Sequence, residues 1–116
     1  MSWTRICRLE ELPVGAVRRA GAGEEAVLAC RVGADEVCAV EDLCTHDDGP
    51  LAEGRLCGEV IECPRHGARF DVRTGAVRRL PAPSPLRTFA ARVRDGWIEV
   101  DVPGAEAPGA GQGGAP

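Results

Sequence analysis

Four residues with metal-binding side chains stand in two short segments, and they constrain the fold of this chain more than any other feature. The first segment reads C-T-H and supplies Cys44 and His46, and the second reads C-P-R-H and supplies Cys63 and His66. The chain has only two histidines, and each follows a cysteine at a short spacing. Thiolate and imidazole ligands together suit zinc, copper or an iron–sulfur cluster. The pattern therefore predicts two loops that hold one metal centre.

The mixed composition of each pair helps to distinguish these metals. In zinc fingers, cysteines usually pair with cysteines and histidines with histidines. Here each loop contributes one of each, and a single residue separates the first pair. A two-iron cluster needs two ligands per iron, so one ligand from each loop allows the cysteines to hold one iron and the histidines the other. A structural zinc site in a protein-interaction module remains an alternative, as does a chance scatter of these residues in loops.

The pattern C-x-H followed by C-x-x-H resembles the Rieske-type [2Fe-2S] proteins. The run H-G-A-R-F-D-V-R-T-G after the second pair is also similar to that family, and the resemblance covers nearly all of residues 3–103. It implies that Cys44 and Cys63 bind a buried iron through sulfur, while His46 and His66 bind an outer iron through an imidazole nitrogen. It also implies an all-β fold, in which an antiparallel β-sandwich carries a smaller cluster-binding subdomain with two ligand loops.

Length and composition allow one small domain. The chain has 116 residues and 3% aromatic residues, so its core must consist mainly of Val, Leu, Ile and Ala. A metal cluster would cross-link such a small β domain. We expect a Rieske domain at residues 1–103, with its cluster-binding subdomain at about residues 42–85. Residues 104–116 are rich in Gly, Ala and Pro and are expected to form a disordered tail.

Short β-prone runs separated by Gly, Pro and Asp are typical of an all-β fold. Three hairpins are predicted, with turns at residues 33–35, 73–75 and 95–96, and the last is an Asp-Gly turn of the preferred kind. The proline-containing segment at residues 81–85 could be a plain linker, but the resemblance implies that it covers the cluster. We expect strands at residues 3–7, 16–19, 26–32, 36–40, 59–62, 69–72, 76–80, 86–93 and 97–102, and a turn or short helical step at residues 8–12.

The four remaining cysteines do not indicate a disulfide framework. Cys7, Cys30, Cys38 and Cys57 form no C-x-x-C pair. Cys30 and Cys38 lie in apolar runs and are expected to be buried small hydrophobic residues, whereas Cys57 precedes a glycine and is expected to be partly exposed. A cytoplasmic location would keep all four reduced.

Charge and hydropathy exclude several classes of partner. The net charge of −4 and the pI of about 5.2 argue against nucleic acid and anionic membranes. No apolar run is long enough to span a membrane, and the N-terminus lacks a signal-peptide pattern, so we expect a soluble, cytoplasmic protein. We also expect a monomer. The basic residues are all arginine, and Lys and Asn are absent, which suggests GC-rich coding and a bacterial source.

Mixed ligation has a predictable effect on the redox potential. Four thiolates would make an oxidised cluster a dianion, whereas two thiolates and two neutral imidazoles leave it uncharged and easier to reduce. High-potential members of the family carry Ser and Tyr hydroxyls where this chain has Ala68 and Phe70. They also carry a loop-to-loop disulfide, at positions that correspond to Gly49 or a near neighbour and to Arg65. We therefore predict a midpoint near about −150 mV, at the low end of the Rieske range.

These residues favour an electron carrier without catalytic residues of its own. Both histidines are assigned to the cluster, which leaves none for a mononuclear iron site or a nucleophile–base pair. The resemblance implies transfer of single electrons from an NAD(P)H-dependent flavin reductase to a terminal non-haem iron oxygenase. Alternatives are the small subunit of an assimilatory nitrite reductase and a protein of iron–sulfur assembly.

Charged residues beside the ligands could guide docking. Asp47 and Asp48 follow the first histidine and would attract a basic partner surface, although they could equally be ordinary solvated loop residues. Arg65 and Arg69 flank the second histidine and would offset that charge or contact partner carboxylates. The sequence does not decide between these roles.

Overall fold

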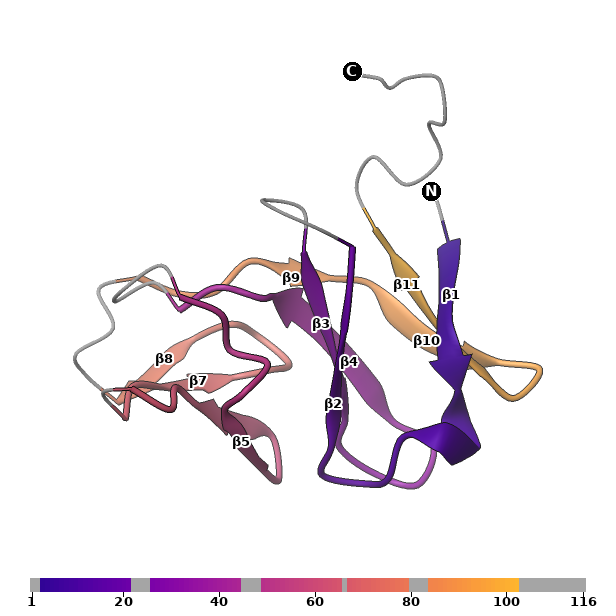
Figure 1. Cartoon of the computed structure of the whole chain (residues 1–116), viewed down its shortest axis with the longest axis horizontal. Helices are drawn as coiled ribbons and strands as arrows, with labels where there is room; N and C mark the ends of the chain where they lie inside the picture. Colours follow the sequence, from indigo (N-terminus) through magenta and orange to yellow (C-terminus); the bar gives the residue numbers. More distant parts are fainter. Residues whose placement is uncertain (1–2, 22–25, 45–48, 66, 80–83, 103–116) are drawn as a thin grey trace, which may run out of the picture.

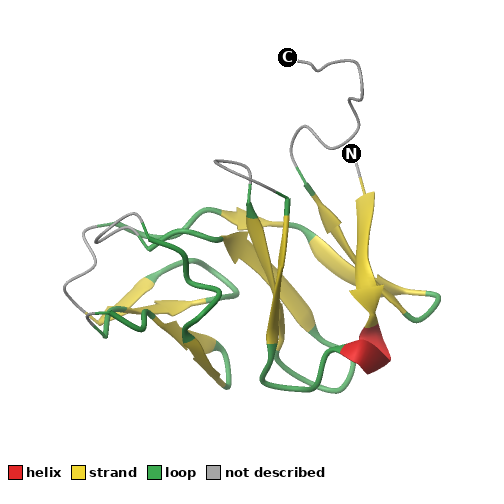
Figure 2. Ribbon diagram, viewed as in Figure 1, coloured by secondary structure: helices red, strands yellow, loops and turns green. Residues whose placement is uncertain are grey.

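The chain folds into three antiparallel sheets. The structure is a computed structural model that describes residues 3–21, 26–44, 49–65, 67–79 and 84–102. Within these residues it contains eleven strands and one short 3-10 helix, η1 (Leu9–Glu11) (Figure 2). This confirms the all-β prediction, and the helix lies where a turn or helical step is expected. In the described part of the chain, no helix is long and apolar enough to cross a lipid bilayer. The tail predicted at residues 104–116 lies outside the described residues.

The first sheet joins the two ends of the domain. It has the order β1 (Trp3–Arg8), β11 (Trp97–Asp101) and β10 (Ala91–Arg94), so the first strand pairs with the last (Figure 1). The β10–β11 hairpin turns at Asp95 and Gly96, whose φ angles of 54° and 80° are those of the turn that suits the twist of paired strands. The predicted Asp-Gly hairpin is confirmed.

The second sheet is the middle layer of the molecule. Its strands are β2 (Val17–Ala20), β3 (Val27–Arg31), β4 (Val37–Glu41) and β9 (Thr88–Phe89), in that order. Alternate residues of a strand face opposite sides of a sheet. Val27, Ala29 and Ala39 accordingly pack against the first sheet, in one core with Ile98 and Val100. Leu28, Cys30 and Val40 belong to a second core on the other side. The middle sheet therefore has an apolar core on each face. Together with the first sheet it forms a sandwich, which we call the basal part of the molecule, and its other face borders the second core.

The third sheet closes this second core. It consists of β5 (Arg55–Cys57), β6 (Val60–Glu62), β7 (Arg69–Asp71) and β8 (Val77–Arg79), joined by successive antiparallel pairings. Its inner face contributes Leu56, Ile61, Phe70 and Val77 to the same core as Leu28 and Cys30. The three-stranded sheet, the middle sheet and the third sheet lie side by side in Figure 1. The third sheet thus forms the scaffold of the subdomain that contains Cys44 and Cys63.

An exposed arginine ties the third sheet to the middle sheet. Arg73, in the turn between β7 and β8, forms ion pairs with Glu59 at 2.7 Å and with Glu36 at 3.2 Å. Glu59 lies in the β5–β6 turn, and Glu36 immediately precedes β4. Surface pairs of this kind contribute little stability each, so the two cores provide most of the stability and Arg73 sets the relative position of the turns.

The structure corrects the strand predicted at residues 86–93. That stretch is divided at Ala90 into β9, which pairs with β4, and β10, which pairs with β11. The Ala90 carbonyl accepts a hydrogen bond from the Asp101 backbone N–H at 3.0 Å, which fixes the crossing between the two sheets. Residues 86–93 contain no Gly, Pro, Asn or Asp, so the sequence gives no turn signal at the division. The short strand β5 was also not predicted as a strand.

Gly75 supports the turn that faces the segment before β9. Its φ is +80°, and a Cβ at this position would overlap the Leu86 carbonyl oxygen. We expect Gly75→Ala to lower the free energy of unfolding by about 2 kcal/mol, because it combines left-handed backbone strain with displacement of Leu86. Gly58→Ala is the matched control, since Gly58 has a φ of +62° but open space around it. Equal losses in urea unfolding of the two variants would contradict the proposed role of Leu86.

Candidate metal centre

The first predicted ligand loop is closed at its base by an aspartate. Asp42 Oδ1 accepts a hydrogen bond from the Leu51 backbone N–H at 2.7 Å, which joins the two ends of the loop. Asp42 Oδ2 lies 2.8 Å from Arg19 Nε, and the Asp42 side chain is fully buried. Inside the loop, the Cys44 N–H donates to the Gly49 carbonyl at 2.7 Å. Cys44 is therefore held at the start of a loop whose ends are fixed.

The second predicted ligand loop is a tight turn between β6 and β7. The Cys63 N–H donates to the Ala68 carbonyl at 2.8 Å, and the Gly67 N–H donates to the Cys63 carbonyl at 3.1 Å. Gly67 has a φ of +76°, which a residue with a side chain rarely adopts. Gly67 therefore allows the backbone to turn back onto Cys63.

Arg65 connects the two loops. Its Nη2 donates a hydrogen bond to the Pro50 carbonyl at 3.0 Å. A Cβ on Gly49 would lie 2.7 Å from the Arg65 guanidinium carbon, so the side chain packs directly over this glycine. These are the positions that the family resemblance associates with a disulfide in high-potential members. In this chain, an arginine and a glycine make the loop-to-loop contact instead.

The two loop cysteines are buried together in the second core. Cys44 is 0% exposed and Cys63 is 1% exposed, and both belong to the same cluster as Phe70 and Ala68. Two buried sulfur atoms at the starts of two connected loops fit the thiolate half of a mixed-ligand cluster. Their apolar surroundings exclude water, as expected for the inner iron of a [2Fe-2S] site.

The other half of the predicted ligand set is not described. His46 and His66 lie outside the described residues, as do Asp47 and Asp48. Their assignment as ligands or docking residues therefore stays a prediction. Arg69 is described: it lies on the outer face of the third sheet and approaches Glu62 at 3.5 Å.

The remaining four cysteines are not candidate metal ligands. Cys30 is fully buried, and burial raises the pKa of its thiol to about 12, so it remains protonated near neutral pH. Cys38 is half-buried and Cys57 is exposed, in line with the prediction for Cys57. Cys7, Cys30, Cys38 and Cys57 form no disulfide in the described part of the chain. These thiols behave as packing or surface residues.

Sequence reasoning did not identify Asp42 as part of the site. The available signal was an acidic residue at the end of an apolar strand, immediately before the first ligand pair. A buried carboxylate at such a position requires partners, and here the partners are the Leu51 N–H and Arg19.

Comparisons with known proteins agree with this geometry. Residues 2–90 match the family model described as the Rieske [2Fe-2S] domain. The ferredoxin component of biphenyl 2,3-dioxygenase from Rhodococcus jostii RHA1 is 42% identical over 104 residues, which cover 90% of this chain and 96% of that protein. A solved complex of reduced oxygenase and oxidized ferredoxin in carbazole 1,9a-dioxygenase contains a chain with a TM-score of 0.79 and 38% identity, covering 84% of this chain and 91% of that one. A putative nitrite reductase small subunit from Mycobacterium tuberculosis has a TM-score of 0.75 at 21% identity, over 84% of this chain and 92% of that one, and so shares the fold alone.

Proposed function

The chain belongs to the Rieske [2Fe-2S] domain family, and from this premise we propose that it is the ferredoxin component of a dioxygenase system. It carries single electrons from an NAD(P)H-dependent flavin reductase to a terminal non-haem iron oxygenase. The observation that carries this proposal is its likeness, along nearly its whole length, to the ferredoxin component of a biphenyl dioxygenase. The likeness to a ferredoxin solved together with its oxygenase supports the oxygenase as partner.

The proposed ligands are Cys44 and Cys63 for the inner iron and His46 and His66 for the outer iron. A [2Fe-2S] cluster, one per chain, supplies reversible one-electron transfer when bound. The described residues provide the environment for it. The second core buries both cysteines, Arg65 connects the loops, and Asp42 fixes the base of the first loop. His46 and His66 would then be the ligands through which electrons pass to and from a partner.

We assign no catalytic residue to this chain. With both histidines assigned as ligands, substrate chemistry belongs to the oxygenase, and this subunit does not determine which substrate is oxidised. The same proposal includes a cytoplasmic location, where the donor has access to a nicotinamide nucleotide, and a monomeric carrier. The buried pair of Cys44 and Cys63 supports the proposal.

A reconstituted electron-transfer assay tests the proposal. Purified protein is mixed with flavin reductases and terminal oxygenases of dioxygenase systems, and NAD(P)H-dependent substrate turnover is measured with and without it. We expect turnover to require this protein with at least one pair. Turnover only with a sirohaem nitrite reductase would instead identify it as a nitrite reductase subunit.

Spectroscopy distinguishes the cluster from a zinc site. The isolated protein is expected to be red-brown, with about two irons per chain and a rhombic EPR signal after dithionite reduction. Colourless protein that contains zinc and lacks acid-labile sulfide would contradict the proposal.

Ala68 and Phe70 predict a low redox potential, because neither side chain can donate a hydrogen bond to a cluster sulfur. Both are fully buried in the core that contains Cys44 and Cys63, and neither carries a hydroxyl donor. A donor to sulfur stabilises the reduced form, and one such bond of about 1.4 kcal/mol shifts a one-electron couple by about 59 mV. We expect a midpoint near about −150 mV for the native protein and an increase of about 50 mV in Ala68→Ser.

A redox titration followed by visible absorption measures both midpoints. The control is Ala90→Ser, because Ala90 is exposed and lies between β9 and β10, on the basal part of the molecule. Its midpoint should equal that of the native protein. A positive native midpoint would contradict the low-potential assignment.

A further inference from the structure

The outer face of the third sheet presents a row of arginines. In the register of β5 to β8, Arg55 pairs with Glu62, Glu62 with Arg69, and Arg69 with Arg79. These four residues therefore form one continuous cross-strand row, which we call the arginine row. The three arginines are exposed, whereas the inner face of the same sheet is apolar. A row of this composition does not contribute to the core, so its charges are available to solvent or to a partner.

The arginine row carries a net positive charge on an acidic protein. Glu62 is the only acid in the row, and its closest approach to Arg69 is 3.5 Å. In the described part of the chain, neither Arg55 nor Arg79 forms an ion pair. The neighbouring Arg78 is already neutralised by Asp71 at 2.7 Å, and hydrogen bonds led by that from Arg78 hold the pKa of Asp71 below its usual value. The face thus has an excess of positive charge, although the whole chain has a net charge of −4.

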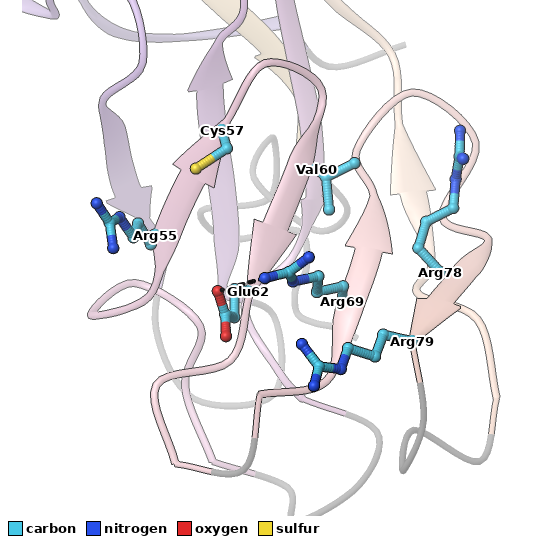
Figure 3. Close-up of a pocket in the computed structure, with 7 residues that line it drawn as sticks. All are labelled: Arg55, Cys57, Val60, Glu62, Arg69, Arg78 and Arg79. Atoms are coloured by element: carbon cyan, nitrogen blue, oxygen red, sulfur yellow. Dashed lines mark hydrogen bonds and ion pairs between the residues drawn. The ribbon is translucent and has the colours of Figure 1, made fainter.

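The arginine row borders an open hollow of about 420 Å³ (Figure 3). Val60 and Cys57 line it together with the row, and Arg55, Arg69 and Arg79 extend from three different strands around Glu62. At a strand spacing of about 4.8 Å, four strands spread the row over about 14 Å. This spread favours several carboxylates on an extended surface over one small anion, which would need convergent donors.

The arginine row also crosses the base of the second ligand loop. Glu62 immediately precedes Cys63, and Arg69 immediately follows Ala68. A hydrogen bond between Cys63 and Ala68 joins the two ends of the loop at this point. A protein seated on the row would therefore lie beside the loop that contains the proposed ligands Cys63 and His66.

We propose that the arginine row is a docking surface for a carboxylate-rich face of a protein that exchanges electrons with this chain. The proposal rests on the proposed function, because it places an electron-transfer partner beside the cluster loop. Guanidinium groups bind carboxylates in a planar, two-pronged geometry, so the row sets the orientation of the partner. Charges on such a surface act on the orientation and the association rate of the partner more than on the final affinity.

The test compares two double variants with equal charge. The row variant, Arg55→Gln/Arg79→Gln, removes two positive charges from the arginine row. The basal variant, Arg18→Gln/Arg94→Gln, removes two exposed positive charges from β2 and β10. Each variant changes the net charge from −4 to −6. Second-order rate constants are measured by stopped flow with the reductase and the oxygenase that support turnover with native protein. We expect the row variant to be about tenfold slower with at least one partner at low salt, and the difference to vanish at high salt.

The basal variant should stay within about twofold of native protein, because its charges lie away from the loop. Arg55→Lys/Arg79→Lys should recover part of the rate, since it keeps the charge and loses the planar geometry. Visible spectrum and midpoint should be unchanged in all variants. Equal slowing of the row and basal variants, or no slowing with either partner, would overturn the proposal.

A binding measurement tests the docking surface without an oxygenase or a reductase, and therefore independently of the proposed function. A fluorescent hexaglutamate peptide serves as the carboxylate probe, and its anisotropy is followed as protein is added at low salt. We expect binding to native protein and to the basal variant, and at least fivefold weaker binding to the row variant. If native protein supports no oxygenase, the proposed function fails, yet this measurement still decides whether the row binds carboxylates. Identical binding to all variants would overturn the docking surface.

Discussion

Cys63→Ala is expected to abolish cluster binding. The substitution removes one of the two buried sulfur atoms at the starts of the connected loops, and alanine offers no ligand in its place. Iron content should fall from about two atoms per chain to background, and the visible absorption should disappear. Because ligand binding is linked to folding, the melting temperature should fall as well. Iron and acid-labile sulfide analysis of freshly purified protein measures the effect.

Cys30→Ala is the matched control for this prediction. Cys30 is as deeply buried as Cys63 and belongs to the same core, but its thiol remains protonated near neutral pH and lies on the middle sheet. Its removal should lower stability by about 1 kcal/mol, as for a small core truncation, and leave iron content unchanged. Loss of iron in Cys30→Ala, or full retention in Cys63→Ala, would contradict the assignment of Cys63.

Features with a local signal were predicted from the sequence. The Asp95-Gly96 hairpin follows from turn chemistry, and the β3–β4 hairpin follows from two apolar runs around residues 33–35. The pairing of β1 with β11 was not predicted, because it joins the two ends of the domain and no local pattern encodes it. The division at Ala90 was missed for the same reason, since the crossing depends on which sheet each half joins.

The candidate site shows the same division between local and distant information. The spacing of Cys44 and Cys63 from the histidines indicated a metal centre, and the structure buries both cysteines in one core. The contact between Arg65 and the first loop depends on how two distant segments meet. The sequence therefore indicated only that Arg65 and a residue near Gly49 stand where high-potential family members carry a disulfide. The arginine row required the strand register, because residues 55, 62, 69 and 79 share no local motif.

Asp42→Ala is expected to destabilise the protein and to release the cluster. The substitution removes the acceptor of the Leu51 N–H at 2.7 Å and the partner of Arg19 at 2.8 Å. It leaves the Leu51 N–H without its acceptor at a fully buried residue. The substitution removes a hydrogen bond to a charged acceptor and leaves a buried N–H donor unpaired. We therefore expect the free energy of unfolding to fall by about 3–5 kcal/mol.

Asp42→Asn separates the two contacts of the aspartate. Asparagine keeps an oxygen that can accept from Leu51, but it lacks the charge that pairs with Arg19, which is half-exposed and can be solvated when unpaired. The buried amide nitrogen of asparagine would face Arg19 without an acceptor, so we expect a loss of about 2 kcal/mol and a normal iron content. Urea unfolding and iron release to a chelator measure the two effects in parallel. If the loop clamp is correct, iron release accelerates at least tenfold in Asp42→Ala and remains near native in Asp42→Asn, because the loop opens only when the Leu51 hydrogen bond is lost. Equal acceleration in both variants would show that the ion pair with Arg19, and not the bond to Leu51, holds the loop, and no acceleration in either variant would contradict a role of Asp42 in holding it.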